Sequence, residues 1–199
     1  MGKIFLLMGK SASGKDAVYR NLLSDDTLAL KKVVMYTTRP MRQNEENGRQ
    51  YFFVDEAAYE KLVREEKIIE ERAYHTQLGL WRYFTADDGQ IDPEKGNYLM
   101  MGTVEAFATL KARFGGDMVV PVLIDTEDGI RLERALKRER KQDTPRYDEM
   151  CRRYLADTED YAKEKLDEAG ITRIFHNNDT LEACLAEVSA FVSEHVAAG

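Results

Sequence analysis

The feature that most constrains the fold is a glycine-rich loop near the start of the chain. It reads Gly9-Lys10-Ser11-Ala12-Ser13-Gly14-Lys15, follows the apolar run Ile4–Met8 directly and opens a helical pattern. This is the spacing of a Walker A loop, in the strand–loop–helix context that such a loop requires. Backbone N–H groups of a loop of this kind point at phosphate, and the positive end of the following helix assists them. The sequence therefore predicts a phosphate-binding cradle, and the alternative is a strand-to-helix turn that binds nothing.

We expect this cradle to bind ATP through its backbone and one cation. The residues concerned are Gly9, Ser11, Ala12, Ser13, Gly14, Lys15 and Asp16. Lys15 would reach the β- and γ-phosphates and neutralise charge during phosphoryl transfer. The position after the lysine is ordinarily Ser or Thr, whose hydroxyl binds Mg²⁺, but Asp16 stands here. A carboxylate is also a hard oxygen ligand, so Asp16 is the candidate ligand for Mg²⁺, directly or through water.

Short apolar runs alternate with helical patterns along the rest of the chain. The runs that indicate buried parallel strands are Lys3–Met8, Lys32–Tyr36, Asn97–Gly102, Met118–Ile124 and Ile171–His176. The helical patterns are Lys15–Leu23, Val104–Phe114, Asp128–Lys141, Arg146–Ala169 and Leu181–Val196. Strands that alternate with helices predict an α/β protein with a parallel core sheet. Together with the loop, this pattern predicts the three-layer P-loop NTPase fold.

Size and charge exclude several classes of protein. At 199 residues the chain fits one compact domain. Lys and Arg total 29 against 36 Asp and Glu, and the net charge of −7 argues against a nucleic-acid partner. No apolar run is long enough to span a membrane, and Cys151 and Cys184 show neither metal nor redox spacing. We therefore expect a cytoplasmic protein with reduced, buried or half-buried thiols and no membrane association; a protein partner is not predicted.

Two stretches interrupt the alternation of strands and helices. Residues 37–90 are polar and rich in turns, with alternating apolar pieces such as Tyr51–Val54, and they predict a small β-containing insertion. Residues 126–155 are strongly charged and have little apolar face, which is typical of a mobile helical flap. The core is therefore expected to carry two accessory parts.

The first of these stretches contains a second motif. Its residues Thr37, Thr38, Arg39, Arg42, Glu45, Gly48, Tyr51 and Phe53 have the spacing T-T-R-x-x-R-x-x-E-x-x-G-x-x-Y-x-F. Downstream of a Walker A loop, this pattern resembles that of guanylate kinases, and the resemblance continues through most of the chain. Taken alone, the segment could be a solvated polar loop with incidental arginines.

The resemblance implies how an acceptor nucleotide would be bound. In guanylate kinases the two arginines and the tyrosine hold the acceptor phosphate, which here assigns that role to Arg39, Arg42 and Tyr51. The arginines would act through forked, charge-assisted hydrogen bonds. Glu70 stands where the family places the glutamate that reads guanine. The adjacent Glu71 could replace it, and either could instead be a carboxylate on a surface helix.

The resemblance also implies a lid that closes over the phosphates. The family has an R-x-R followed by an R-R pair, and the matching residues are Arg138, Arg140, Arg152 and Arg153. Such arginines stabilise the transferring group, as an arginine finger does. The candidate catalytic residues are therefore Lys15, Arg42, Arg140 and Arg153. A charged, exposed helix is the alternative, and we expect it for Arg131 and Arg134. The segment Asn177–Asp179 resembles one that lies near the donor adenine, and is equally typical of a helix cap.

At several positions the chain differs from the guanylate kinase pattern, and most of these positions take part in base recognition in that family. Met35 replaces a serine, Leu78 and Leu80 flank Gly79 where the family has a tyrosine–glycine–serine or threonine turn, and the strand at 98–102 has no carboxylate. A lost hydrogen-bonding group in a base pocket costs discrimination, because polar atoms of the base then stay unpaired. A nearby aromatic and polar group could stack on the base, or could be the insertion's own small core. Its members are Tyr74, His75, Thr76, Trp81 and Tyr83, of which Thr76 is a further candidate for acceptor binding.

These expectations combine into one interpretation. The chain would be a single guanylate kinase-like domain over residues 1–199, with a core of 1–33, 91–125 and 165–199, an acceptor-binding insertion at 34–90 and a lid at 126–164. It would transfer the γ-phosphoryl group of ATP to GMP, or to dGMP, with Mg²⁺ as cofactor. Two alternatives stay open: the same fold with a different acceptor, and a catalytically weak module that binds a protein partner.

Overall fold

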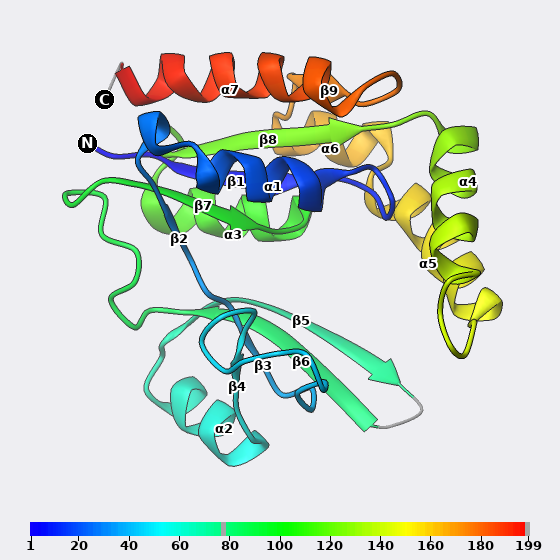
Figure 1. The fold of residues 1–199 in the computed structure, drawn as a ribbon. Helices are drawn as coiled ribbons and strands as arrows, with labels where there is room; N and C mark the ends of the chain where they lie inside the picture. The colour runs from blue at the N-terminus through cyan, green and yellow to red at the C-terminus, as the bar shows by residue number, and fades with distance from the viewer. Residues whose placement is uncertain (77–78, 198–199) are drawn as a thin grey trace.

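The computed structural model describes residues 1–76 and 79–197 and shows two separate sheets with helices around them (Figure 1). The larger sheet has five parallel strands in the order β2-β7-β1-β8-β9. Its strands are β1 (Ile4–Met8), β2 (Leu30–Lys32), β7 (Asn97–Met101), β8 (Val119–Asp125) and β9 (Ile174–His176). The predicted α/β class with a parallel core sheet is confirmed. Leu78, one of the departures from the family pattern, lies outside the described residues.

Helices cover both faces of the five-stranded sheet. They are α1 (Lys15–Ser24), α3 (Val104–Phe114), α6 (Lys163–Ala169) and α7 (Leu181–Ala197), with the short 3₁₀ helix η1 (Asp26–Leu28) after α1. Alternate side chains of a strand point to opposite faces, so β1 contributes to two buried clusters. Phe5 and Leu7 pack with α1 and α7, whereas Ile4, Leu6 and Met8 pack with α3 and α6. The result is the predicted three-layer arrangement.

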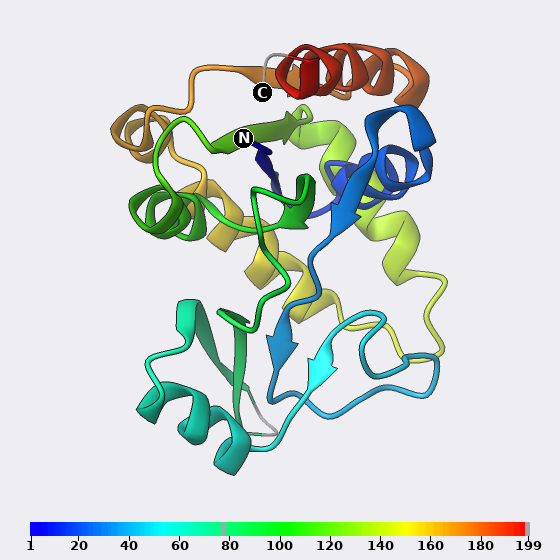
Figure 2. The same ribbon diagram turned by 90° about the vertical axis from the view of Figure 1, so that its left-hand side faces the viewer.

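The smaller sheet is joined to the core by two segments of chain (Figures 1 and 2), and Ile69 of its strand β5 packs against the core. Its strand order is β4-β3-β6-β5. The strands are β3 (Tyr36–Thr37), β4 (Phe52–Phe53), β5 (Ile68–Thr76) and β6 (Gly79–Ala86). Helix α2 (Glu56–Arg64) packs on one face, where the rings of Tyr59 and Phe84 lie 5.2 Å apart. This sheet therefore has a small core of its own.

The strand expected over Lys32–Tyr36 is wrong as a single element. Its first residue, Lys32, ends β2 in the large sheet, and its last residue, Tyr36, begins β3 in the small one. The chain crosses between the sheets in this run, and the side chain of Gln90 bonds both backbone groups of Val34 at 2.9 and 3.0 Å. Gln90 lies on the segment that leads from the small sheet back to the core. It therefore links the two segments of chain that join the sheets. An extended apolar run does not reveal which sheet it joins.

The helix expected over Arg146–Ala169 is also wrong as a single element. It consists of α5 (Tyr147–Asp160) and α6, with a break at Tyr161, whereas the preceding helix α4 (Asp128–Glu139) lies within its expected bounds. The Tyr161 side chain packs against the core, and the next residue, Ala162, has an extended backbone. Anchoring of this aromatic ring therefore interrupts a stretch whose charged composition is helical throughout.

The structure also bears on membrane spans and on the thiols. Among residues 1–76 and 79–197, no helix combines the length and apolar character needed to cross a membrane. Cys184 is buried in the core, but Cys151 is exposed, contrary to expectation. The reason is that α5 contributes no side chain to the buried set. The cytoplasmic location stays a prediction.

Candidate active site

The cradle lies where β1 ends and α1 begins, and two of its glycines are required sterically. Gly9 and Gly14 have φ angles of 153° and 90°, which L-residues rarely adopt. A Cβ atom on Gly9 would lie 2.4 Å from the carbonyl oxygen of Ile124, and one on Gly14 would lie 2.2 Å from Nδ2 of Asn177. A larger residue would therefore displace β8 or the Asn177 side chain. The loop connects strand and helix as the motif requires.

Two buried side chains hold the middle of the cradle. The carbonyl oxygen of Ser13 accepts hydrogen bonds from Nδ2 of Asn177 at 2.8 Å and from the hydroxyl of Thr126 at 3.0 Å. Thr126 follows β8 and Asn177 follows β9, so the carboxyl ends of two parallel strands support the loop. The first turn of α7 is capped by Thr180, whose hydroxyl accepts the N–H of Ala183 at 3.2 Å. Asn177 therefore supports the cradle rather than capping the helix.

Lys15 and Asp16 occupy the first turn of α1. Lys15 is half-buried and Asp16 is exposed, and within the described residues neither side chain forms an ion pair. In the same part of the chain, no three His, Cys, Asp or Glu side chains are arranged to hold a metal ion. Magnesium in kinases is commonly held by one or two carboxylates together with substrate phosphates. Asp16 beside the cradle fits that donor set.

The tip of the cradle is held by helices α4 and α5, through residues that the sequence did not reveal. The expectation that Arg131 is exposed is wrong, because its side chain is 0% exposed. Its guanidinium donates to the carbonyl of Ser11 at 3.1 Å and to the carboxylate of Asp157 at 2.9 Å. Arg134 is half-buried and donates to a backbone carbonyl at 3.1 Å. The available signal was spacing, since Arg131 lies one helical turn before the small, buried Ala135.

Arg39 is buried and paired within its own loop. Its side chain is 3% exposed, and its two terminal nitrogens donate to the two carboxylate oxygens of Glu45 at 2.9 and 2.8 Å. Burial lowers the pKa of Arg39, but interactions with Glu45 and Tyr83 together outweigh it and raise that pKa, and the hydrogen bonds from Arg39 hold the pKa of Glu45 below its usual value. Among the described residues, Nε of Arg39 has no hydrogen-bond partner. The pair therefore shapes the loop and leaves one buried donor unused.

Tyr51 and Arg42 lie on the same loop in different environments. The Tyr51 ring is 5.6 Å from that of Tyr83 and 5.7 Å from the guanidinium of Arg39. Burial raises the pKa of Tyr51, so its hydroxyl stays protonated and can donate a hydrogen bond. The side chain of Arg42 is exposed, while its backbone N–H bonds Glu45 at 2.8 Å. The structure thus brings Arg39 and Tyr51 together and leaves the guanidinium of Arg42 in solvent.

Glu70 and Glu71 lie on strand β5, so the surface helix considered as an alternative is wrong. Adjacent residues of a strand face opposite sides. Glu70 is 5% exposed, accepts the hydroxyl of Thr85 at 2.7 Å and pairs with Arg72 at 3.3 Å. Glu71 instead accepts the hydroxyl of Tyr59 at 2.6 Å. Both oxygens of Glu70 therefore have neighbours, Oε1 the hydroxyl of Thr85 and Oε2 the Nε atom of Arg72.

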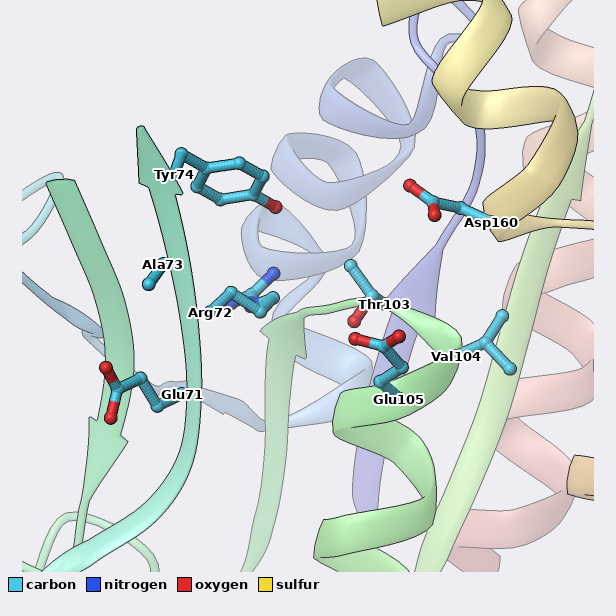
Figure 3. Close-up of a pocket in the computed structure, with 8 residues that line it drawn as sticks. All are labelled: Glu71, Arg72, Ala73, Tyr74, Thr103, Val104, Glu105 and Asp160. Carbon is cyan, nitrogen blue, oxygen red and sulfur yellow. The ribbon is translucent and has the colours of Figure 1, made fainter. Parts of the chain in front are cut away.

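A cavity of about 270 Å³ opens between β5 and the start of α3 (Figure 3). Arg72 and Tyr74 reach toward it from β5, Thr103 and Glu105 border it on α3, and Asp160 faces it from the end of α5, while Glu71 points away. Partial burial raises the pKa of Asp160, and the nearby carboxylate of Glu105 adds to the shift. The cavity therefore presents two carboxylates, a guanidinium and hydroxyl groups to a ligand.

The aromatic group near this cavity is not the core of the small sheet. That core consists of Tyr59, Phe84 and Ala86. Tyr83 precedes Phe84 in β6 and faces the other side, where its ring lies 5.8 Å from that of Tyr74. Tyr74 is 45% exposed, which leaves its ring accessible to a ligand. Thr76 ends β5, and its side chain lies outside the part of the chain that the structure describes.

The four arginines predicted for the lid are not gathered at the cradle. They are Arg138, Arg140, Arg152 and Arg153, and all are exposed. Arg152 and Arg153 donate to Glu149 at 2.7 and 2.8 Å, and these bonds, Arg152 first, lower the pKa of Glu149 to about 2. Arg140 borders a surface hollow at the end of α4. The turn between α4 and α5 extends away from the five-stranded sheet (Figure 1).

Comparison with known sequences supports the resemblance. The guanylate kinase family model matches residues 1–79. A guanylate kinase from Nitrosomonas europaea is 37% identical over 78 residues, which are 39% of this chain and 38% of that protein. One from Mycoplasma pneumoniae is 29% identical over 119 residues, which are 60% of this chain and 49% of that protein. The chain thus matches less than half the length of these curated relatives, and over that part the resemblance to the guanylate kinase family is confirmed.

A solved structure extends the likeness in fold to nearly the whole chain. The crystal structure of guanylate kinase from Anaplasma phagocytophilum covers 98% of this chain and 86% of its own, with a TM-score of 0.64 and 19% sequence identity. At that identity the likeness shows the fold. The P-loop NTPase fold predicted from the sequence is confirmed.

Proposed function

We propose that this chain, a relative of the guanylate kinases in residues 1–79 and in fold, transfers the γ-phosphoryl group of ATP to GMP. One observation carries the proposal: the matched segment contains both the cradle with Lys15 and the loop with Arg39, Arg42 and Tyr51. A donor cradle on the core and a cationic loop on the small sheet fit a reaction between two phosphate-bearing substrates. The enzyme is an ATP-dependent nucleoside monophosphate kinase in this account.

The proposed reaction needs positioned charge rather than a general base. An oxygen of the acceptor phosphate forms a bond to the γ-phosphorus, and the bond from that phosphorus to the β,γ-bridging oxygen breaks, so ADP leaves with the electron pair. The acceptor oxygen is largely ionised near neutral pH, because the second pKa of a phosphate monoester is about 6. Lys15 neutralises charge on the donor phosphates. Arg42 and Tyr51 orient the acceptor phosphate, and Arg39 adds its unused donor.

Mg²⁺ fits beside the cradle in this proposal. Asp16 would hold it as a hard oxygen ligand, directly or through water, with phosphate oxygens of the nucleotide as further ligands. When bound, the ion neutralises phosphate charge. Asp16 itself brings negative charge next to Lys15, so its own contribution is to keep the cation at this end of the cradle.

The cavity beside β5 is the proposed site of the acceptor base. Guanine presents N–H donors on its Watson–Crick edge, and carboxylates are the acceptors that suit them. Glu105 and Asp160 face the cavity, and Glu70 lies on the same strand as Arg72 and pairs with it. Glu105 follows β7 by four residues and supplies an acidic group near the strand at 98–102, which has none. Tyr74, with its ring exposed, can stack on the base.

The lid and the insertion complete the proposal. We assign residues 34–90 to acceptor binding, residues 126–164 to the lid and the remainder to the core. Arg140 and Arg153 would act on the transferring phosphoryl group after the lid closes, since both are exposed in this structure. Closure would also exclude water, which protects ATP from hydrolysis.

The test is a panel of acceptors. Purified protein is incubated with ATP and Mg²⁺ and one each of GMP, dGMP, AMP, CMP, UMP and dTMP, and ADP formation is followed. We expect the highest kcat/KM with GMP, and we expect Glu105→Gln to narrow the preference for GMP over AMP by about fivefold, the effect of one hydrogen bond. Preference for another monophosphate would overturn the base assignment. ATP binding without turnover on any acceptor would favour the binding module.

A further inference from the structure

Both backbone groups of Ser11, at the tip of the cradle, are bound by side chains from α4 and α5. The Ser11 N–H donates to Oδ2 of Asp157 at 2.7 Å, and the Ser11 carbonyl accepts from Nε of Arg131 at 3.1 Å. Arg131 closes the ring through its Nη2, which lies 2.9 Å from the same oxygen of Asp157. One ion pair thus holds both backbone polar groups of a single residue of the loop.

The ion pair is itself held firmly. Arg131 is fully buried and Asp157 is 14% exposed. Arg131 also bonds Asp128, and its guanidinium lies 4.7 Å from the ring of Tyr154. Asp128 in turn pairs with Lys10 of the cradle at 3.5 Å. A buried ion pair adds little net stability by itself, but it fixes the geometry of the groups that it joins.

A second contact ties the same helix region to the cradle. The hydroxyl of Tyr161, directly after α5, accepts the N–H of Gly9 at 3.1 Å. This tyrosine is the residue at which the expected long helix breaks. The start and the tip of the cradle are therefore both bound to the end of α5.

The backbone next to Ser11 is in a conformation that needs such support. Ala12 has a φ angle of 62°, in the left-handed region that an L-residue adopts only when its surroundings hold it there. Glycine would adopt this conformation at no steric cost. The tip therefore relies on contacts outside the loop, and the contacts to Ser11 are the ones adjacent to Ala12.

We propose that Arg131 and Asp157 are positioning residues that hold the tip of the cradle in its ATP-binding shape and join it to α4 and α5. The inference rests on the proposed function, since it takes ATP as the ligand of the cradle. Neither residue needs to touch the nucleotide. Movement of α4 and α5 as a lid is transmitted directly to the loop, because the ion pair that joins these helices is also hydrogen-bonded to Ser11.

The test measures ATP affinity directly, without turnover. ATP binding to the full chain is titrated by calorimetry for the wild type, Asp157→Ala, Asp157→Asn and Arg131→Met, with Glu159→Ala as the matched control on an exposed carboxylate of α5. We expect Asp157→Ala to weaken ATP binding about tenfold, the value of a lost charge-assisted hydrogen bond, and Asp157→Asn to weaken it less because its amide oxygen still accepts from Ser11. The control should bind as the wild type does, and the acceptor KM should be unchanged in Asp157→Ala.

Thermal unfolding shows which variants are folded, and Asp157→Asn, the milder change, keeps the test decisive if Arg131→Met does not fold. Unchanged ATP affinity in folded Asp157→Ala and Asp157→Asn, with only Tm reduced, would make the pair a structural contact and overturn the proposal. Tighter ATP binding would overturn it too, because Asp157 would then compete with phosphate for the Ser11 N–H. Failure of the wild type to turn over any acceptor would count against the proposed function, whereas the affinity difference would still decide the role of the pair.

Discussion

The cradle and the lid arginines are the two regions that would supply positive charge to the transferring phosphoryl group. They differ in how firmly the rest of the protein holds them. The cradle is bound by residues that follow β8 and β9 and by side chains of α4 and α5, all distant in sequence, among them the buried Asn177 and Arg131. Arg152 and Arg153 are exposed and bound by Glu149 of their own helix. One region is preformed and the other is not.

The difference assigns the two regions to different stages of the reaction. A preformed loop can bind ATP without rearranging, which limits the conformational entropy that binding costs. Exposed arginines on a helix of the lid would act only after a movement, as is common for lids that complete a catalytic site. Changes in the cradle should therefore reduce ATP affinity and rate together, whereas changes at the exposed lid arginines should reduce the rate alone.

The largest expected effect is at Lys15. Lys15→Ala should lower kcat with ATP and GMP by about 10³-fold, because a preorganised positive group at the phosphates is lost. Initial rates of ADP formation measure the effect, and Lys61→Ala, an exposed lysine of α2, is the control. Retention of more than a tenth of the wild-type rate would remove Lys15 from the mechanism.

The lid should give a smaller effect of a different kind. Arg153→Ala should lower kcat by about 10²-fold, the lower part of the range for charge stabilisation at a transition state, and leave the Kd for ATP unchanged. Stopped-flow turnover and calorimetry separate the two quantities, with Arg64→Ala on α2 as the control. A matching loss of ATP affinity would mean that the lid arginine already acts in the open structure, and the contrast between the two regions would fail.

Replacement of the two arginines of the acceptor loop should affect the stability of the protein differently. Arg42→Ala should raise the KM for GMP about tenfold without loss of stability, because its guanidinium is exposed. Arg39→Ala should also lower the free energy of unfolding by about 2 kcal/mol, because Glu45 loses its hydrogen-bonded partner. Steady-state kinetics and urea unfolding measure the two effects. Equal stability of both variants would contradict the role given to the Arg39–Glu45 pair.

The smallest expected effect concerns pH and the lid. Glu149 has a folded-state pKa of about 2, below its usual 4.5, so its contribution to stability is present above pH 4.5 and is lost as pH falls toward 2. Because these groups are substantially exposed, the contribution should be below about 1 kcal/mol. The free energies of unfolding of the wild type and Glu149→Gln, compared across this range, measure it. A difference that grows on acidification would have the wrong sign for this pair.

Local pattern predicted much of the fold. The expected bounds of Val104–Phe114 match α3, where Thr103 caps the first turn and Gly115 ends the last. The strand before the cradle and the helix after it also lie where the loop motif requires them. These elements are specified by spacing, caps and glycines within a few residues, which a sequence displays directly.

Long-range contacts account for what the sequence did not reveal. Nothing near Arg131 in the sequence indicates that its guanidinium meets Ser11 and Asp157, which come from other elements. Tyr161 likewise breaks a helical pattern because its side chain packs in the core and its hydroxyl meets the cradle. Each of these contacts depends on how elements pack against one another, and composition along a single helix does not encode it.

The most direct test of the account is a single assay that quantifies ADP and GDP together by chromatography after the protein is incubated with ATP, Mg²⁺ and GMP. We predict that the two products form in equal amounts and that both require GMP. Formation of ADP without GDP would show hydrolysis in place of transfer. Absence of both products would show that the chain is not a kinase for GMP.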